Sequence, residues 1–184
     1  MIVDGVGMRL LEPGDAAGLA DVLARNRAYM APFEPSRPEA FYTEAGQRAR
    51  IAGVLAERDA GRIVPYVFVE TATGAVVGSI NLGNIVLGPL RSGGVGYWVD
   101  RAWNGRGLAT AGVEEVCRAA RDEVGLHRVE AGTLVDNAAS QRVLAKAGFE
   151  QYGLAPRYLH INGAWRDHCL FQRILHGDPP PAGG

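Results

Sequence analysis

The sequence predicts a layered α/β domain, because patterns typical of strands and of helices follow one another along the chain. Apolar runs at 62–69, 75–82 and 95–99 predict strands. Apolar residues three and four positions apart then predict a long helix, which Gly125 ends. The pair Asn162-Gly163 lies between two further strand-like runs and is the strongest hairpin signal in the chain.

The first half of the chain contains four expected strands and two expected helices. They are a strand at 8–11, a helix from the N-cap Asp15 to Asn26, a helix at 43–60, and strands at 62–69, 75–82 and 95–99. The segment 30–43 holds three prolines. Because proline lacks a backbone N–H and clashes with the preceding helical turn, this segment is expected to be extended or turned.

The second half begins with the long helix and ends with the hairpin. After the helix come a strand at 128–134, a short helix from the N-cap Asn137 to Gly148, and strands at 149–161 and 164–174. Residues 1–176 are expected to form a single domain. The tail at 177–184 is rich in proline and glycine, which predicts disorder.

Composition limits the class of protein. The 184 residues can bury a core without disulfides or metals, and Cys117 and Cys169 lie in apolar patterns. The formal net charge is −1, so the basic face of a nucleic-acid-binding domain is not expected. The four histidines lack the spacing of metal ligands, and no metal is expected. Without a leader or a long apolar run, the sequence predicts a cytoplasmic protein with no membrane segment.

A Gly-rich turn between the strand at 95–99 and the long helix is the strongest candidate for a binding site. The first backbone N–H groups of a helix lack partners, and the helix dipole favours negative charge there. Such a turn is suited to phosphate. Gly105 and Gly107 let a ligand approach the backbone closely, and Arg101 and Arg106 offer positive charge to the same anion.

One interpretation of the turn is a dinucleotide site. The spacing Gly105-x-Gly107-x-x-Thr110 is a degenerate dinucleotide fingerprint, with Glu130 at the place of the ribose-binding acid. The third glycine is absent, however. The remaining chain is also too short for further βαβ units of about 30 residues each.

The downstream sequence favours another interpretation. The run 137–149 reads Asn-Ala-Ala-Ser-Gln-Arg-Val-Leu-Ala-Lys-Ala-Gly-Phe. Here the chain resembles the GNAT superfamily of acetyl-CoA-dependent N-acetyltransferases, whose loop reads Gln/Arg-x-x-Gly-x-Gly/Ala and whose next helix reads Asn-x-x-Ser-x-x-Val/Leu-x-x-x-x-Gly-Phe. Gly107 and Ala109 fit the loop, whereas Asn104 stands where Gln or Arg is usual. That departure changes one side chain and leaves the backbone N–H groups in place.

Two distant segments, 25–35 and 158–168, look like the ribosomal-protein-alanine N-acetyltransferase branch (RimJ/RimL), the RimJ type especially. The resemblance implies a mostly antiparallel sheet of six to seven strands, flanked by about four helices and splayed at the acetyl-CoA site. It implies acetyl transfer to the N-terminal α-amine of a ribosomal protein, by a monomer or homodimer that associates with ribosomes. Two alternatives stay open, a small-molecule amine as acceptor and a noncatalytic acyl-CoA-binding module, since fold alone does not choose an acceptor.

The resemblance also implies particular site residues. The expected coenzyme contacts are Trp98, Val99, Arg101, Asn104, Gly105, Arg106, Gly107, Leu108, Ala109, Thr110, Asn137 and Ser140. The expected acceptor contacts are Phe33, Glu34, Tyr97 and Asp167. Glu34 is the candidate base, and Ser140 is the candidate acid toward the coenzyme sulfur, because Leu144 replaces the tyrosine of many relatives. Simpler interpretations are a solvated carboxylate for Glu34 and a helix-start serine for Ser140.

Overall fold

The computed structural model describes residues 1–179, so most of the tail expected at 177–184 lies outside the described residues. The seven strands are β1 (Val6–Leu10), β2 (Val64–Glu70), β3 (Val76–Val86), β4 (Ser92–Val99), β5 (Arg128–Leu134), β6 (Glu150–Ile161) and β7 (Ala164–Ile174). The four α-helices are α1 (Ala16–Met30), α2 (Glu44–Asp59), α3 (Leu108–Asp122) and α4 (Ala138–Lys146). Short 3₁₀ turns lie at Pro13–Asp15, Glu39–Tyr42 and Arg101–Trp103. The predicted mixed sheet with about four helices is confirmed.

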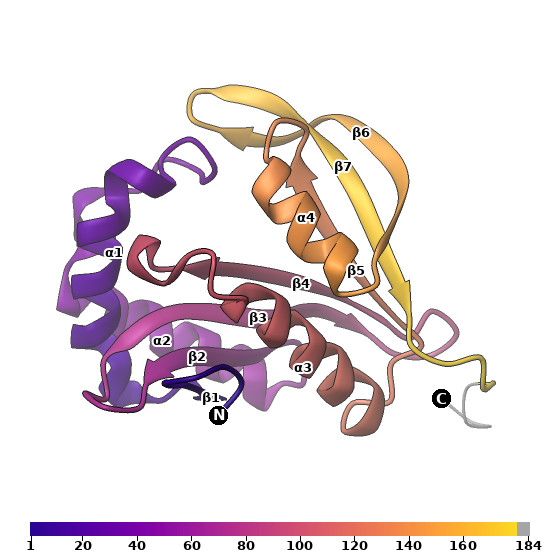
Figure 1. Cartoon of the computed structure of the whole chain (residues 1–184), viewed down its shortest axis with the longest axis horizontal. Coiled ribbons are helices and arrows are strands. Elements are labelled where there is room, and N and C mark those ends of the chain that lie inside the picture. The colour runs from indigo at the N-terminus through magenta and orange to yellow at the C-terminus, as the bar shows by residue number, and fades with distance from the viewer. Residues whose placement is uncertain (180–184) are drawn as a thin grey trace.

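All seven strands form one sheet in the order β1-β2-β3-β4-β5-β7-β6 (Figure 1). Neighbouring strands are antiparallel except β4 and β5, which are parallel. The parallel pair is also the shortest ladder, with only Ser92↔Arg128, Gly93↔Val129 and Gly94↔Glu130 in register. Both strands continue beyond this ladder, so the sheet separates there into two parts.

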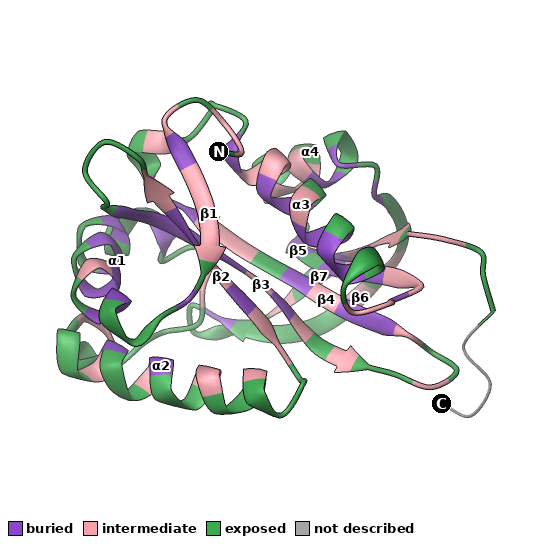
Figure 2. Ribbon diagram, turned by 90° about the horizontal axis from the view of Figure 1, so that it is seen from below, coloured by how far each residue is buried: buried purple, intermediate pink, exposed green. Residues whose placement is uncertain are grey.

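The helices cover opposite faces of the sheet (Figure 2). Adjacent strand residues point to opposite faces, and in β2 the side chain of Val67 joins the core under α1 and α2 whereas that of Phe68 joins the core under α3. In α3, Gly112 leaves room for this contact, because a Cβ there would lie 2.5 Å from Phe68 Cζ. Close packing on both faces therefore holds α3, and the turn before it, at a defined position against the sheet.

Two details of the first helix differ from the prediction. The helix α1 continues four residues past Asn26 to Met30, whose side chain is buried. Proline prevents helix only from position 32 onward, so nothing stops the chain earlier. Asp15 does occupy the N-cap position, but its carboxylate makes no cap hydrogen bond to α1. It accepts hydrogen bonds from the Arg9 guanidinium at 2.6 and 2.9 Å and from the backbone N–H of Glu12.

The remaining elements follow the predicted order with small shifts of their ends. The strand β3 extends to Val86 instead of ending at 82. The hairpin at Asn162-Gly163 is confirmed, with β7 having the predicted bounds. The two cysteines, Cys117 and Cys169, are free and buried, as expected of core residues.

Candidate active site

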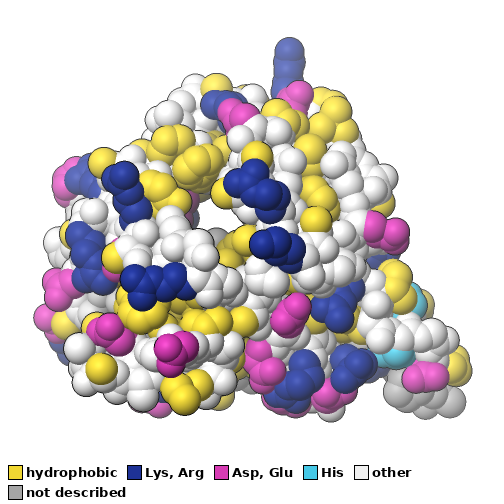
Figure 3. All heavy atoms as spheres, in the orientation of Figure 1, with side chains coloured by type: hydrophobic (Ala, Val, Ile, Leu, Met, Phe, Trp, Pro, Cys, Tyr) yellow, Lys and Arg dark blue, Asp and Glu magenta, His cyan; other side chains and the backbone are white. Residues whose placement is uncertain are grey.

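The separation of β4 from β5 opens a cavity of about 700 Å³. Its walls come from the end of α1 and the segment after it, the second halves of β4 and β5, the Gly-rich turn with the start of α3, and α4. Figure 3 shows a hollow near the centre of this face, with several Lys and Arg side chains around it. Segments from both halves of the chain thus meet at one site.

The Gly-rich turn presents unpaired backbone donors to this cavity. Gly107 is the N-cap of α3 with φ 79°, a left-handed conformation that favours glycine. No side chain caps the helix, and Leu108, Ala109 and Thr110 supply its first N–H groups and line the cavity. A Cβ at Gly107 would have no heavy atom within 4 Å, so the space beside the turn is open. This arrangement fits a pyrophosphate group at the helix N-terminus.

Contacts with α1 hold the start of this turn. Arg25 on α1 donates from Nε and Nη2 to Oδ2 of the buried Asp100, at 2.9 and 2.5 Å. The buried Asn26 accepts from the backbone N–H of Arg101 at 2.9 Å. Residues about 75 positions apart in sequence therefore support the Gly-rich turn.

Three predicted coenzyme ligands contact aromatic side chains. Asn104 lines the cavity and donates to the Tyr29 hydroxyl at 2.7 Å. Arg101 and Arg106 do not line the cavity. The Arg101 guanidinium lies 5.7 Å from the centroid of the Tyr29 ring, and the Arg106 guanidinium lies 4.5 Å from the centroid of the Trp103 ring. The predicted contacts of Arg101 and Arg106 with a phosphate group stay a prediction.

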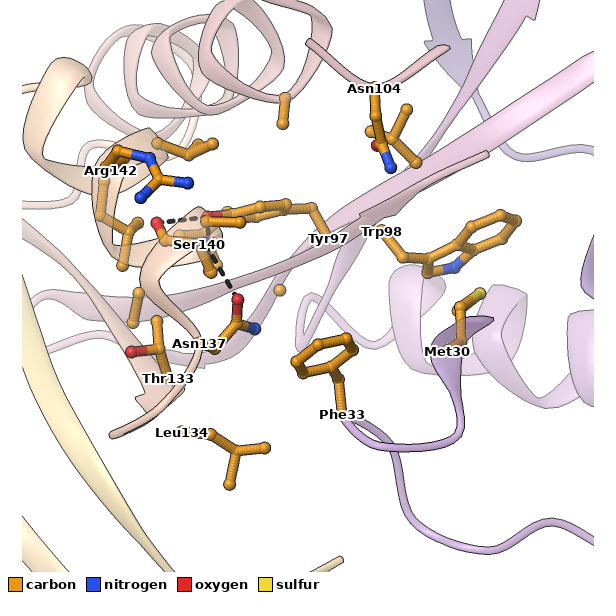
Figure 4. A pocket seen from close by; sticks show the side chains of 18 of the residues that line it. Met30, Phe33, Tyr97, Trp98, Asn104, Thr133, Leu134, Asn137, Ser140 and Arg142 are labelled. Carbon is orange, nitrogen blue, oxygen red and sulfur yellow. Dashed lines mark hydrogen bonds between the residues drawn. The ribbon is translucent and has the colours of Figure 1, made fainter. Parts of the chain in front are cut away.

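Ser140 and Tyr97 bring two hydroxyl groups together inside the cavity (Figure 4). Tyr97 Oη lies 2.9 Å from Ser140 Oγ and 3.3 Å from the Ser140 carbonyl oxygen. Asn137 caps α4 by accepting from the backbone N–H of Ser140 at 3.1 Å. The cap fixes the first turn of α4 and directs the serine toward β4, so Asn137 can cap its helix and line the site at the same time.

Burial raises the pKa of Tyr97 to about 12, although its hydrogen bond with Ser140 opposes the shift. The phenol therefore keeps its proton throughout the neutral range. A protonated Tyr97 can donate to Ser140 Oγ, which leaves the serine proton directed elsewhere.

Glu34 and Phe33 approach the same cavity from the segment after α1. Phe33 lies across the gap from Tyr97 (Figure 4). Glu34 is half-buried and lines the cavity, unlike the solvated carboxylate of the simpler interpretation. Burial raises the pKa of Glu34 above its usual range, and the nearby Arg37 and Arg50 partly oppose the shift. A carboxylate with a raised pKa is a better proton acceptor near neutral pH than a solvated one.

Two acids named from the sequence lie elsewhere. The exposed Asp167 does not line the cavity, and its carboxylate accepts from the backbone N–H of Arg157 at an irregularity of the hairpin. Its neighbour His168 lines the cavity instead. Glu130 is bonded to the Arg128 guanidinium at 2.6 Å and to the Tyr152 hydroxyl at 2.8 Å, outside the cavity.

Sequence reasoning missed several lining residues. Arg142 and Lys146 lie one turn apart on α4 and line the cavity, and a basic pair at this spacing after the N-cap Asn137 was a usable signal. The buried Thr133 on β5 also lines it, and its hydroxyl has no hydrogen-bond partner among the described residues. No local pattern distinguishes this threonine from any other strand residue.

Comparison with known proteins decides which family uses this cavity. Residues 6–150 match the model of the acetyltransferase (GNAT) domain. The chain belongs to the GNAT acetyltransferase family. It therefore is an enzyme that transfers an acetyl group to an amine, and the dinucleotide interpretation is wrong.

Individual relatives are similar over nearly the whole chain. A probable N-acetyltransferase of Bacillus subtilis (strain 168), YjcK, is 35% identical, covering 93% of this chain and 94% of the relative. The structure of a ribosomal-protein-S5-alanine acetyltransferase from Vibrio fischeri is 32% identical with a TM-score of 0.91, covering 97% of each chain. Mycobacterium smegmatis RimJ, solved in complex with CoA-disulfide, is 34% identical with a TM-score of 0.87, covering 92% of this chain and 81% of the other.

Two further properties of this acetyltransferase concern residues 1–179. None of the helices there is long and apolar enough to cross a membrane. The same residues contain no group of three or more His, Cys, Asp or Glu side chains that could hold a metal ion.

Proposed function

We propose that this GNAT acetyltransferase transfers the acetyl group of acetyl-CoA to the N-terminal α-amine of a protein, with a ribosomal protein that begins with alanine as the first candidate. One observation carries the proposal. A single cavity extends from the unpaired N–H groups of Leu108–Thr110, past the hydroxyl pair of Tyr97 and Ser140, to the half-buried carboxylate of Glu34. It joins a phosphate cradle to a candidate base.

The donor fits the cavity in two ways. The cradle at Gly107 suits the pyrophosphate of acetyl-CoA. Beyond Gly94, β4 has no ladder with β5, so the edge of Val95–Val99 can pair with the amide groups of the pantetheine arm as an added strand would. We assign oxyanion stabilisation to a backbone N–H near Val99, which lines the cavity.

The acceptor end supplies the proton transfers. Glu34, directly or through water, accepts the proton of the ammonium group, and the neutral amine then attacks the thioester carbonyl. The C–N bond forms and the carbonyl oxygen becomes an oxyanion; the C–S bond then breaks, the sulfur leaves with the electron pair, and the nitrogen releases its second proton to solvent. Ser140 donates a proton to that sulfur and regains one from solvent, while Tyr97 donates a hydrogen bond to Ser140 Oγ, an orientation that the 2.9 Å contact allows.

The chemistry favours an α-amine as acceptor. An α-amine has a pKa of about 7.8 and is roughly one-tenth neutral at pH 7, whereas a lysine amine with a pKa of about 10.4 is neutral in far less than one molecule in a thousand. A single half-buried carboxylate is therefore a sufficient base to deprotonate an α-amine. The ribosomal-protein-S5-alanine acetyltransferase of Vibrio fischeri, which resembles this chain over its whole length, supports the protein acceptor.

An acceptor screen tests this function. Purified protein is incubated with acetyl-CoA and peptides that begin with alanine, in parallel with polyamines and aminoglycosides, and released thiol and product mass are measured. We expect the peptides to be acetylated at the N-terminus. Acetylation of a small amine in place of every peptide contradicts the protein acceptor, and absence of thiol release with all acceptors contradicts it as well.

Binding of the donor gives a second test. Acetyl-CoA at 100 times its Kd should raise the free energy of unfolding by about 2.7 kcal/mol, and NAD should have no effect. Gly107→Pro should abolish this stabilisation, because proline cannot adopt φ 79° and lacks the N–H. Asn104→Gln, which introduces a residue usual in the family at this position, should keep the stabilisation by acetyl-CoA. Thermal unfolding with and without each ligand measures the effect.

The melting curve of ligand-free Gly107→Pro controls for misfolding. If that variant does not fold, Gly107→Ala provides a milder test, because a Cβ there meets open space and only the backbone conformation is strained. Stabilisation by NAD and not by coenzyme A would contradict the assigned donor.

The same proposal covers the setting of the reaction. We infer that residues 1–176 act as a single domain, as a monomer or homodimer in the cytoplasm. The partner is the terminus of a protein, in association with ribosomes or before assembly, because the net charge of −1 offers no steering toward RNA.

A further inference from the structure

A second, smaller cavity adjoins the acceptor end of the first. It measures about 150 Å³ and shares Met30, Glu34 and Pro35 with the main cavity. Its other walls include Arg27, Arg37 and the hairpin residue Asn162. Figure 1 shows the turn between β6 and β7 reaching toward the segment after α1, where these residues meet. A ligand bound at Glu34 can therefore continue into this second cavity.

The charges around the second cavity are not balanced. Arg27 is neutralised by Glu39, which accepts two hydrogen bonds from it at 2.8 and 2.5 Å. Arg37 and Arg50 have no carboxylate within 4.0 Å in the part of the chain that the structure describes. The more distant Glu34 partly offsets their charge.

Both guanidinium groups lie near one aromatic ring. Arg37 lies 4.9 Å and Arg50 5.9 Å from the centroid of the same ring, that of Phe41. Arg50 is partly buried, and its burial and the neighbouring charge of Arg37 lower its pKa. Arg37 lines the smaller cavity and Arg50 does not, and an anion bound beside Arg37 is stabilised by both positive charges.

The backbone holds the two ends of this charge pattern in place. Glu34 precedes Pro35 and Arg37 precedes Pro38. A residue before proline is restricted to extended conformations, so both charged residues stand on a stiff segment. The site thus presents the Glu34 carboxylate at the junction of the cavities and the Arg37 guanidinium in the wall of the smaller one.

We propose that the smaller cavity is a specificity subsite for an acidic side chain within the first few residues of the acceptor protein. This rests on the proposed function. The α-ammonium lies at Glu34, and the carboxylate of a following Asp or Glu lies beside Arg37, with Arg50 adding positive charge from outside the cavity lining. One extended residue spans about 3.3 to 3.6 Å, so the second, third or fourth residue is the one that reaches an adjoining cavity.

Paired peptides test the subsite. Each peptide begins with alanine and carries Glu or Gln at position 2, 3 or 4, with neutral residues elsewhere, and kcat/KM is measured for every pair. At one position, the Glu peptide should react about tenfold better than the Gln peptide, the scale of a partly exposed charge-assisted hydrogen bond. The ratio should fall at high salt, because the pair is partly exposed.

Arginine variants show whether the subsite causes the preference. Arg37→Gln should reduce the Glu/Gln ratio to about one, and Arg50→Gln should reduce it in the same direction. Arg48→Gln is the matched control, since Arg48 is exposed on α2 and paired with Glu44, and should keep the ratio. Using a ratio within each variant cancels any effect of the lost arginine on Glu34, because both peptides present the same amine.

The outcomes separate the two proposals. Equal reaction of Glu and Gln peptides at all three positions overturns the subsite and leaves the proposed function intact. A preference that persists in both Arg37→Gln and Arg50→Gln also overturns the subsite. Failure of every peptide, neutral or acidic, overturns the proposed acceptor and the subsite with it. Thermal unfolding of the Arg50→Gln protein, whose arginine is partly buried, shows whether its result reports on a folded enzyme.

Discussion

Glu34→Gln is expected to lower kcat with an α-amine peptide by about 10²- to 10⁴-fold at pH 6 to 7, the range that general base catalysis contributes. The loss should shrink as pH rises through about 8, because the α-amine then loses its proton to solvent. Burial raises the pKa of Glu34. As the pH is lowered, Glu34 should therefore become protonated, and wild-type activity should begin to fall, at a pH above the usual range of a glutamate. Measuring kcat and KM from pH 6 to 9 for both proteins tests this.

Two other results would assign Glu34 differently. A higher KM with little change in kcat would mean that Glu34 binds the ammonium without accepting its proton, because only uniform binding is lost. Unchanged constants and an unchanged pH profile would remove Glu34 from the mechanism.

Ser140→Ala provides the contrasting variant. The coenzyme thiol has a pKa near 8.5, so the sulfur can leave as a thiolate without being protonated. An ammonium group, in contrast, cannot attack until it has lost its proton. The loss in kcat should therefore be about 10² or less, and nearly the same from pH 6 to 9. A loss larger than that of Glu34→Gln would make departure of the sulfur the harder step.

Peptides with a free α-amine are expected to react about 400-fold faster than α-blocked peptides carrying one lysine, at equal binding. The factor follows from a difference of about 2.6 units between the two amine pKa values, or roughly 3.5 kcal/mol of deprotonation free energy. Competition between the two peptides, with products separated by mass, measures the ratio at pH 7. Small first residues such as alanine should be preferred among the free peptides.

The pH dependence of this ratio is its control. The α-amine is mostly neutral above pH 8, whereas the lysine amine continues to gain reactivity up to about pH 10, so the ratio should decrease over that interval. Equal reaction of blocked lysine peptides at pH 7 would mean that proton removal by Glu34 is not limiting, and the N-terminal assignment would fail.

Much of this fold can be predicted from short stretches of sequence. Local patterns predicted three features that depend on neighbours within a few residues. They are the Asn162-Gly163 turn with its flanking strands, the end of α3 near Gly125, and the cap at Asn137. The Gly-rich turn is equally local. Glycine at position 107 permits the left-handed conformation that starts α3, and the unpaired N–H groups follow from the helix itself.

Predictions from local signals failed where a distant partner competes. Asp15 has the residue type and position of an N-cap, but its carboxylate bonds the Arg9 guanidinium and the Glu12 backbone. Asp167 stands near the expected acceptor site in sequence, yet its carboxylate supports the backbone of Arg157 on the opposite strand. Strand register decides that the neighbouring His168 faces the cavity.

By itself, the sequence determined the order of the elements, the Gly-rich turn at the start of α3 and the family, because each depends on residue types at short spacings. Only the tertiary structure placed Glu34 next to the cavity of Ser140, paired Ser140 with Tyr97, and left Arg37 and Arg50 without carboxylate partners among the described residues. These features depend on packing between segments far apart in the chain. The burial that raises the pKa values of Glu34 and Tyr97 exists only after those segments meet.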